Sequence, residues 1–116
     1  MSNNFPIKKY SSLKKFFNDF IKKIELKLME VNVNKIEEAA KIIEKKIKKK
    51  NNIFVCGNGG SSAIANHYVT DFVKMVRSKT NLKPKLLSLN ANNGLISAIS
   101  NDIKYDDIFT YQAESY

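Results

Sequence analysis

A short apolar run followed by a glycine-rich turn constrains the fold of this chain more than any other feature. Residues 53–62 have the sequence IFVCGNGGSS. The run that ends at Cys56 suits a strand covered on both faces, with the cysteine as a small buried hydrophobe. Gly57, Gly59 and Gly60 can adopt positive φ and let a ligand approach the main chain. Because Ser61 then opens a helix whose first amide groups lack intrahelical partners, we expect a site for a small anionic or oxygen-rich ligand.

Other roles for the glycine turn fit less well. A dinucleotide fingerprint needs GxGxxG and an acidic residue about 20 positions further on, but position 62 is Ser62 and the second apolar strand ends at Leu89 and Asn90 without a carboxylate. A nucleotide P-loop needs Gly-Lys-Ser/Thr, which is missing. A tight strand-to-helix connection without any ligand stays an open alternative.

The residues after the turn predict an α/β fold. A helix is expected over residues 61–77 and a second strand over residues 85–89, KLLSL, which together form a right-handed parallel crossover. Two further helical pieces are expected over residues 95–99 and 105–114, with Asn101 and Asp102 between them. Two strands alone are seldom a stable sheet, so the chain is expected to be the first half of a larger fold.

The N-terminal part predicts two amphipathic helices. Apolar residues at three- and four-residue spacing favour a helix over residues 11–31, capped by Ser11 or Ser12. A second helix is expected from Asn34, with Glu37 in capping-box spacing, to about residue 49. The two helices are expected to pair as an antiparallel hairpin. We therefore expect a helical hairpin over residues 1–50 and a partial α/β domain over residues 51–116.

The net charge of +9 is concentrated in the N-terminal half. Residues 1–50 carry 14 lysines and six acidic residues, whereas residues 51–116 are nearly balanced. The run KKIKKK over residues 45–50 ends a helix, where the helix dipole favours lysines, so nucleic-acid binding is not expected. No apolar run is long enough to cross a bilayer and no signal peptide is recognisable, so a cytoplasmic protein without a membrane partner is expected.

His67 and Asp71 are the residues of the predicted helix best suited to chemistry. Their i, i+4 spacing places an imidazole and a carboxylate on one helix face. Such a pair can share a divalent metal, or can transfer protons beside a ligand held at the helix start. An ordinary surface pair is the alternative. A structural zinc site of the Cys/His type is excluded, because Cys56 and His67 are the only residues of their kinds.

Several motifs together resemble a known family. The string FVCGNGGSSAIANHYVTDF, followed by LSLN, then by AISNDIKYDDIF and Gln112, resembles the sugar isomerase (SIS) domain of the phosphoheptose isomerases, which act on sedoheptulose 7-phosphate. The resemblance runs from about Ile53 to Glu114. It implies a doubly wound, flavodoxin-like parallel sheet and a ketose-to-aldose isomerase of sugar phosphates on the route to surface heptoses and lipopolysaccharide. It also implies zinc and a homo-tetramer in which N-terminal residues such as Phe16, Phe20 and Ile24 lie at subunit contacts.

The resemblance also implies a role for each matching residue. The residues that would bind substrate are Asn58, Gly59, Gly60, Ser61 and Asp102. His67 would be a metal or substrate ligand, and Asp71 would be both a metal ligand and the general base.

Two departures from the family keep a second interpretation open. Asp71 stands where the isomerases generally have Glu, so the carboxylate is retracted by one methylene, and catalysis is sensitive to shifts of about 1 Å. The Ser/Thr-rich phosphate loop and the distal Gln and His lie beyond Tyr116 in the family pattern. Isomerisation through an enediol needs both a base and an acid. The alternative is a non-catalytic module that binds a sugar phosphate or a protein partner.

Overall fold

The computed structural model describes residues 5–6 and 8–116, which fall into two compact units divided after Glu38. In the first unit, α1 (Leu13–Met29) begins at the N-cap Ser12, whose side chain accepts a hydrogen bond from Lys15 N at 3.3 Å. The sequence predicted Ser11 or Ser12 as the cap, and the structure shows that it is Ser12. Apart from Phe16, the large apolar residues that α1 carries at positions 13–29 are exposed, so its stripe is not covered within the described chain.

A small polar cluster precedes α1. Lys8 Nζ lies 3.0 Å from Asp19 Oδ2 and 5.1 Å from the centre of the Tyr10 ring. The hydrogen bond from Lys8 holds the pKa of the Asp19 carboxyl below its ordinary value, and the same bond raises the pKa of Lys8. All three side chains are near the surface, so the cluster orders the start of the helix without forming a core.

The second helix, α2 (Val33–Lys48), begins two residues earlier than predicted. Asn32 Oδ1, and not Asn34, accepts the capping hydrogen bond from Lys35 N, at 3.3 Å. Both asparagines are suitable N-cap residues. The sequence favoured Asn34 because Glu37 follows it at capping-box spacing, and this choice was wrong. The predicted hairpin pairing of α1 and α2, and the division at residue 50, stay predictions.

The strand pair lies at the centre of the second unit. β1 (Asn52–Val55) and β2 (Lys85–Ser88) are parallel, with Asn52 opposite Lys85 and Val55 opposite Ser88. Both strands and their parallel order are confirmed. The prediction that Cys56 is a buried residue of the strand is wrong, because Cys56 follows β1 and is exposed. Residues 53–55 are only partly buried, since each strand of a two-stranded sheet has one edge without a neighbour.

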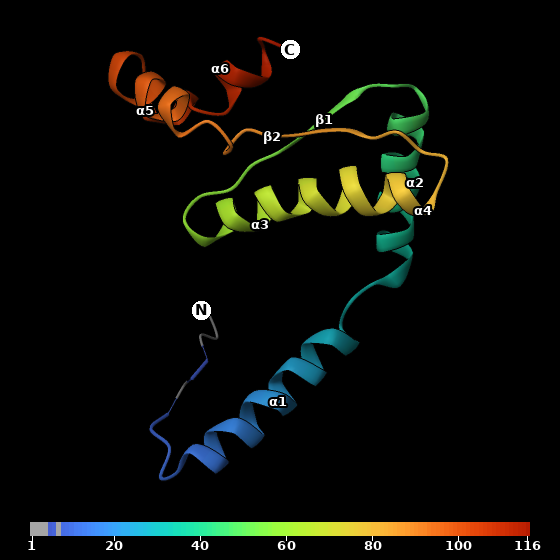
Figure 1. Ribbon diagram of the computed structural model, residues 1–116. Coiled ribbons are helices and arrows are strands. Elements are labelled where there is room, and N and C mark those ends of the chain that lie inside the picture. Colours follow the sequence, from blue (N-terminus) through green and yellow to red (C-terminus); the bar gives the residue numbers. More distant parts are fainter. Residues whose placement is uncertain (1–4, 7) are drawn as a thin grey trace. The chain divides into compact units, whose positions relative to one another are not determined.

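A continuous helical segment connects the strands (Figure 1). It starts as α3 (Gly60–Thr70), widens into a π-helix (Asp71–Val76), and ends as α4 (Arg77–Lys79). The predicted helix over residues 61–77 is confirmed, but the π-helical part was not foreseen. In Figure 1, this segment runs along one side of the strand pair, and the helices that follow β2 lie on the other side. This two-sided arrangement confirms the predicted α/β class.

The chain after β2 forms three short helical elements. These are α5 (Asn93–Asp102), a 3-10 turn (Tyr105–Asp107) and α6 (Thr110–Ala113). Asn101 and Asp102 were expected to separate two helical pieces, but both belong to α5. The N-cap of the helix is Asn92, whose side chain accepts a hydrogen bond from Leu95 N at 2.9 Å, and this cap fixes the start of α5 at the next residue.

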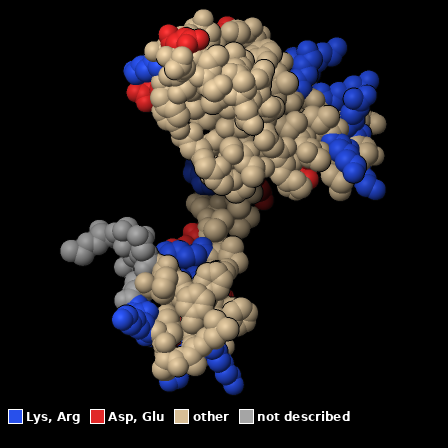
Figure 2. Space-filling model, turned by 60° about the vertical axis from the view of Figure 1, so that its left-hand side comes forward, with Lys and Arg blue, Asp and Glu red and all other residues tan. Residues whose placement is uncertain are grey.

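The core of this unit is small. Its buried apolar residues come from α2, α3, β2, α5 and the segments beside them: Ile47, Ala65, Leu86, Leu89, Ile99 and Ile108. Two polar residues, Asn90 and Gln112, are buried with them. The upper part of Figure 2 shows Lys and Arg side chains gathered on one side of this unit. In the sequence of α2, the last turn contains Lys45, Lys46 and Lys48, where the helix dipole favours them.

Among residues 5–6 and 8–116, no helix combines the length and the apolar character that crossing a membrane requires.

Candidate functional site

The glycine turn lies at the carboxyl edge of the strand pair, where open α/β sheets bind their ligands. Gly59 has φ 56° and ψ −128°, which glycine adopts without strain, and α3 begins at the next residue. Ser61 N donates to Asn58 O at 3.1 Å, and Ser62 N donates to Gly59 O at 3.1 Å. With Gly57 N, which donates to the Asn90 side chain, three amides of the turn are already paired. Within the described residues, the amides of Asn58, Gly59 and Gly60 have no such partner, and those of Gly59 and Gly60 are the ones at the start of α3.

Two side chains of the turn flank these amides. Asn58 and Ser61 are both exposed, and neither side chain makes a hydrogen bond within the part of the chain that the structure describes. An amide and a hydroxyl at these positions can donate to or accept from the hydroxyl groups of a sugar. The turn thus offers unpaired main-chain donors and two polar side chains to an oxygen-rich ligand.

Two of the three glycines of the turn are needed, for different reasons. A Cβ at Gly57 would lie 2.6 Å from both the Cβ and the backbone oxygen of Ser61, so only glycine fits where the turn meets the helix. Gly59 is needed for its positive φ. Gly60 has neither constraint, because a Cβ there would meet nothing within 4 Å. Of the three glycines, only Gly59 uses the positive φ that glycine can adopt.

Asn90 joins the second strand to the turn, and its role was missed in the sequence. Its side-chain oxygen accepts from Gly57 N at 2.8 Å, and its side-chain nitrogen donates to Gly57 O at 2.9 Å. Asn90 N donates to Ser88 Oγ, and Ser88 Oγ donates to Asn66 Oδ1 at 2.6 Å. The only signal for this network is the pair of polar residues, Ser88 and Asn90, at the end of an apolar strand.

His67 and Asp71 are brought together on the helix that follows the turn. His67 Nε2 lies 3.6 Å from Asp71 Oδ2, and the two side chains are 75% and 54% exposed. Asp71 is also the first residue of the π-helix, a conformation that is rare in proteins overall but often occurs at functional sites. With a rise of 1.5 Å per residue, His67 lies about 10 Å and Asp71 about 16 Å along the helix from Gly60. A ligand that touches both the turn and Asp71 must therefore extend along the helix.

The pair is chemically suited to zinc but incomplete. Imidazole nitrogen and carboxylate oxygen are ordinary zinc ligands, and zinc takes three or four protein ligands. No group of three or more His, Cys, Asp or Glu side chains able to hold a metal occurs within residues 5–6 and 8–116. His67 and Asp71 therefore fit two positions of a zinc site, and the others need ligands from outside this set.

Asp102 is at the end of α5 that is farther from β2 along the chain. Its carboxylate accepts a hydrogen bond from Asn101 Nδ2 at 2.7 Å, and it is the last residue of α5. A helix of that length places it about 14 Å from the end of α5 that follows β2. It lines a separate shallow polar hollow, whose other lining residues are Ser97, Ala98, Ser100 and Asn101. Its proposed contact with substrate stays a prediction.

The chain is therefore an α/β protein whose candidate ligand site is the glycine turn at the carboxyl edge of two parallel strands. The sequence pattern of the SIS domain family matches residues 16–116, so the chain belongs to the SIS domain family.

Similar curated proteins share one description. The phosphoheptose isomerase of Buchnera aphidicola subsp. Schizaphis graminum is 39% identical over 87 residues, which cover 74% of this chain and 43% of that protein. The phosphoheptose isomerase of Synechocystis sp. is 34% identical over 80 residues, which cover 69% of this chain and 41% of that protein. The chain thus spans less than half the length of these relatives.

A solved structure has the same fold. The phosphoheptose isomerase GmhA from Neisseria gonorrhoeae aligns with a TM-score of 0.71 and 24% identity, covering 88% of this chain and 53% of that chain. This likeness confirms the predicted SIS-type α/β fold.

Proposed function

We propose that this chain forms the sugar-binding part of a phosphoheptose-isomerase-type site, with sedoheptulose 7-phosphate as its ligand. The observation that carries the proposal is the turn of a SIS domain at the carboxyl edge, with the Gly59 and Gly60 amides available beside Asn58 and Ser61. The relatives named phosphoheptose isomerase supply the substrate class. The product would be a heptose precursor of lipopolysaccharide, made in the cytoplasm.

The chemistry proposed for the complete site is ketose-to-aldose isomerisation. Asp71 would take a proton from C1 of the ketose, and the electron pair would form the C1–C2 double bond of an enediol as the C2 oxygen is protonated by a general acid. Return of a proton to C2, with loss of the proton from the C1 hydroxyl, gives the aldose. The family resemblance gives the role of the acid to a distal histidine, which is distinct from His67, the only histidine of this sequence.

Binding without turnover is the second candidate. It is favoured by the distance of about 16 Å along the helix between Gly60 and Asp71. The Asp71 side chain is one methylene shorter than the Glu of the family, so it does not help to span this distance. It is also favoured by the exposure of His67 and Asp71, because proton transfer is more efficient in a site that excludes water.

Calorimetric titration with sedoheptulose 7-phosphate, run beside an assay for aldose formation, separates the candidates. Binding with turnover supports the isomerase. Binding alone supports the module, and the absence of binding would contradict both.

Zinc binding is expected to depend on His67 and to be weak in this chain alone. Two ligands leave zinc largely hydrated, whereas stable sites use three or four protein ligands. When bound, zinc would act as a Lewis acid toward a ligand oxygen. The expected result of a competition titration with a chromophoric chelator is one weak site, lost in His67→Ala and in Asp71→Asn. Unchanged binding in both variants would show that the metal binds elsewhere.

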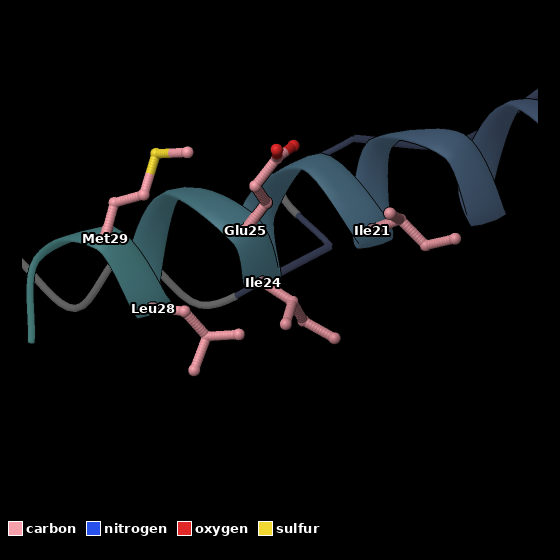
Figure 3. A pocket seen from close by; sticks show the side chains of 5 residues that line it. All are labelled: Ile21, Ile24, Glu25, Leu28 and Met29. Atoms are coloured by element: carbon pink, nitrogen blue, oxygen red, sulfur yellow. The ribbon is translucent and has the colours of Figure 1, made fainter.

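We also propose that the chain forms a homo-oligomer through α1. The helix carries an apolar groove lined by Ile21, Ile24, Leu28 and Met29, with Glu25 at its border (Figure 3). These apolar side chains are 43% to 72% exposed, which is unfavourable unless another surface covers them. A second copy of the same groove supplies a surface of matching chemistry.

Replacing one residue of the groove is expected to dissociate the oligomer. A carboxylate in an apolar interface is costly, so Ile24→Glu should raise the dissociation constant by about 100-fold, equivalent to about 3 kcal/mol. Analytical ultracentrifugation measures the change. Lys23→Gln makes the same one-unit change in net charge at a residue of α1 that does not line the groove, and it serves as the control. If the wild-type chain is monomeric, or if both variants dissociate equally, the groove is not the interface.

A further inference from the structure

Asn90 ends the hydrogen-bond ladder between the two strands. The last regular bond runs from Leu89 N to Val55 O at 3.0 Å. In a parallel ladder, the next bond would run from Gly57 N to Leu89 O. Instead, Leu89 O accepts from Gln112 Nε2 at 3.0 Å, and Gly57 N donates to the Asn90 side chain at 2.8 Å. The main chain can therefore leave the sheet at Gly57 without losing a hydrogen bond.

A primary amide suits this position because Gly57 presents one donor and one acceptor to it. Asn90 meets the Gly57 N–H with its oxygen and the Gly57 C=O with its nitrogen, at 2.8 and 2.9 Å. The donor on Gly57 fixes the orientation of the amide. A carboxylate could accept the first bond but would set an oxygen against the Gly57 carbonyl. Asn90 is 8% exposed, so water does not readily replace the lost partners.

The same residue is coupled to the helix that carries His67 and Asp71. Its backbone N–H donates to Ser88 Oγ at 3.2 Å, and the Ser88 hydroxyl donates to Asn66 Oδ1 at 2.6 Å. Asn66 is the residue before His67. One short network therefore connects the end of β2 with both the turn and α3.

We propose that Asn90 is the positioning residue of the ligand site, which it serves through Gly57 and through Ser88 without touching the ligand. The bidentate contact holds Gly57, and the chain from Gly57 to Gly59 then directs the Gly59 and Gly60 amides toward the ligand. This inference rests on the proposed function for its ligand, but the position of the turn can be measured without one.

The test compares Asn90→Ala with Asn92→Ala in the full chain. Asn92 is a matched control, because it is also an asparagine after β2, but its side chain caps α5 and does not contact the turn. Hydrogen exchange of the hydrogen-bonded Gly57 and Ser61 amides is followed by NMR, and sedoheptulose 7-phosphate binding by calorimetry. In Asn90→Ala, we expect exchange about tenfold faster and a dissociation constant about tenfold higher, since small shifts of positioned groups weaken binding strongly. Asn92→Ala should change neither.

The outcomes distinguish this inference from the proposed function. Faster exchange in Asn90→Ala without ligand binding by the wild type would support the inference and contradict the proposed function. Wild-type exchange and affinity in Asn90→Ala, or equal changes in both variants, would overturn the inference. If Asn90→Ala does not fold, Ser88→Ala removes the link to Asn66 and the acceptor of Asn90 N but leaves the bidentate contact with Gly57, so it should raise exchange at the turn to a smaller extent. Unchanged exchange in that variant would then overturn the proposed coupling.

Discussion

Gly57→Ala is expected to destabilise the chain by about 3 kcal/mol, the upper end of the cost of overpacking. The added Cβ would lie 2.6 Å from the Ser61 backbone oxygen, so the turn and the start of α3 must separate. The shift would also stretch the two hydrogen bonds between Gly57 and Asn90. Urea unfolding measures the loss, and the sugar phosphate should no longer bind.

The other two glycines of the turn provide a graded control. Gly59→Ala forces alanine to a φ of 56°, which costs about 1 to 2 kcal/mol, although a Cβ there meets no atom within 4 Å. Gly60→Ala has neither problem and should stabilise the chain by about 0.5 kcal/mol through the unfolded state. Equal decreases in the free energy of unfolding at all three positions would show that the turn is not packed as described.

Asp71→Asn is expected to abolish proton removal from the sugar phosphate. The amide keeps the size of the side chain but cannot act as a base, so exchange of the C1 hydrogens with D2O should fall at least about 100-fold. Deuterium in recovered sedoheptulose 7-phosphate measures this step separately from aldose formation. Deuterium exchange at C1 requires the base to remove a proton from C1, but it does not require a proton to be delivered to C2.

The opposite substitution tests the length of the carboxylate. Asp71→Glu extends the side chain by one methylene, and because position 71 is 54% exposed, the added group meets little steric resistance. Faster exchange is expected if reach limits catalysis. Exchange that is equal in the wild type, Asp71→Asn and Asp71→Glu would mean that Asp71 is not the base, and the binding module would then be the better description.

The sequence predicts the arrangement of this fold well where one local pattern dominates. Apolar runs bounded by turn residues predict β1 and β2 within about one residue, and glycines followed by serines predict the start of α3. Cys56 was misjudged because it continues the apolar run in composition but follows the last strand residue. Asn34 was misjudged because Asn32 offers the same capping chemistry two residues earlier.

The features that sequence reasoning missed are non-local or depend on backbone geometry. The contact between Gly57 and Asn90 joins residues 33 positions apart, and no periodicity predicts such a pair. The π-helix that begins at Asp71 depends on a shift in backbone hydrogen bonding, which its residue types do not signal. Since His67 and Asp71 are close in sequence, their proximity was predictable, whereas the distance of Asp102 from the sheet edge depends on the extent of α5.

The most direct test of the central claim is an NMR titration of the labelled chain with sedoheptulose 7-phosphate. If the carboxyl-edge turn binds the sugar phosphate, the largest chemical-shift changes will occur at the amides of Gly59 and Gly60, with smaller changes at Asn58 and Ser61. Nonspecific attraction of the phosphate to basic residues predicts another result, with the largest changes at the lysines of residues 45–50 and a strong dependence on salt. Changes confined to those lysines, or no change at the turn at saturating ligand, would contradict the account.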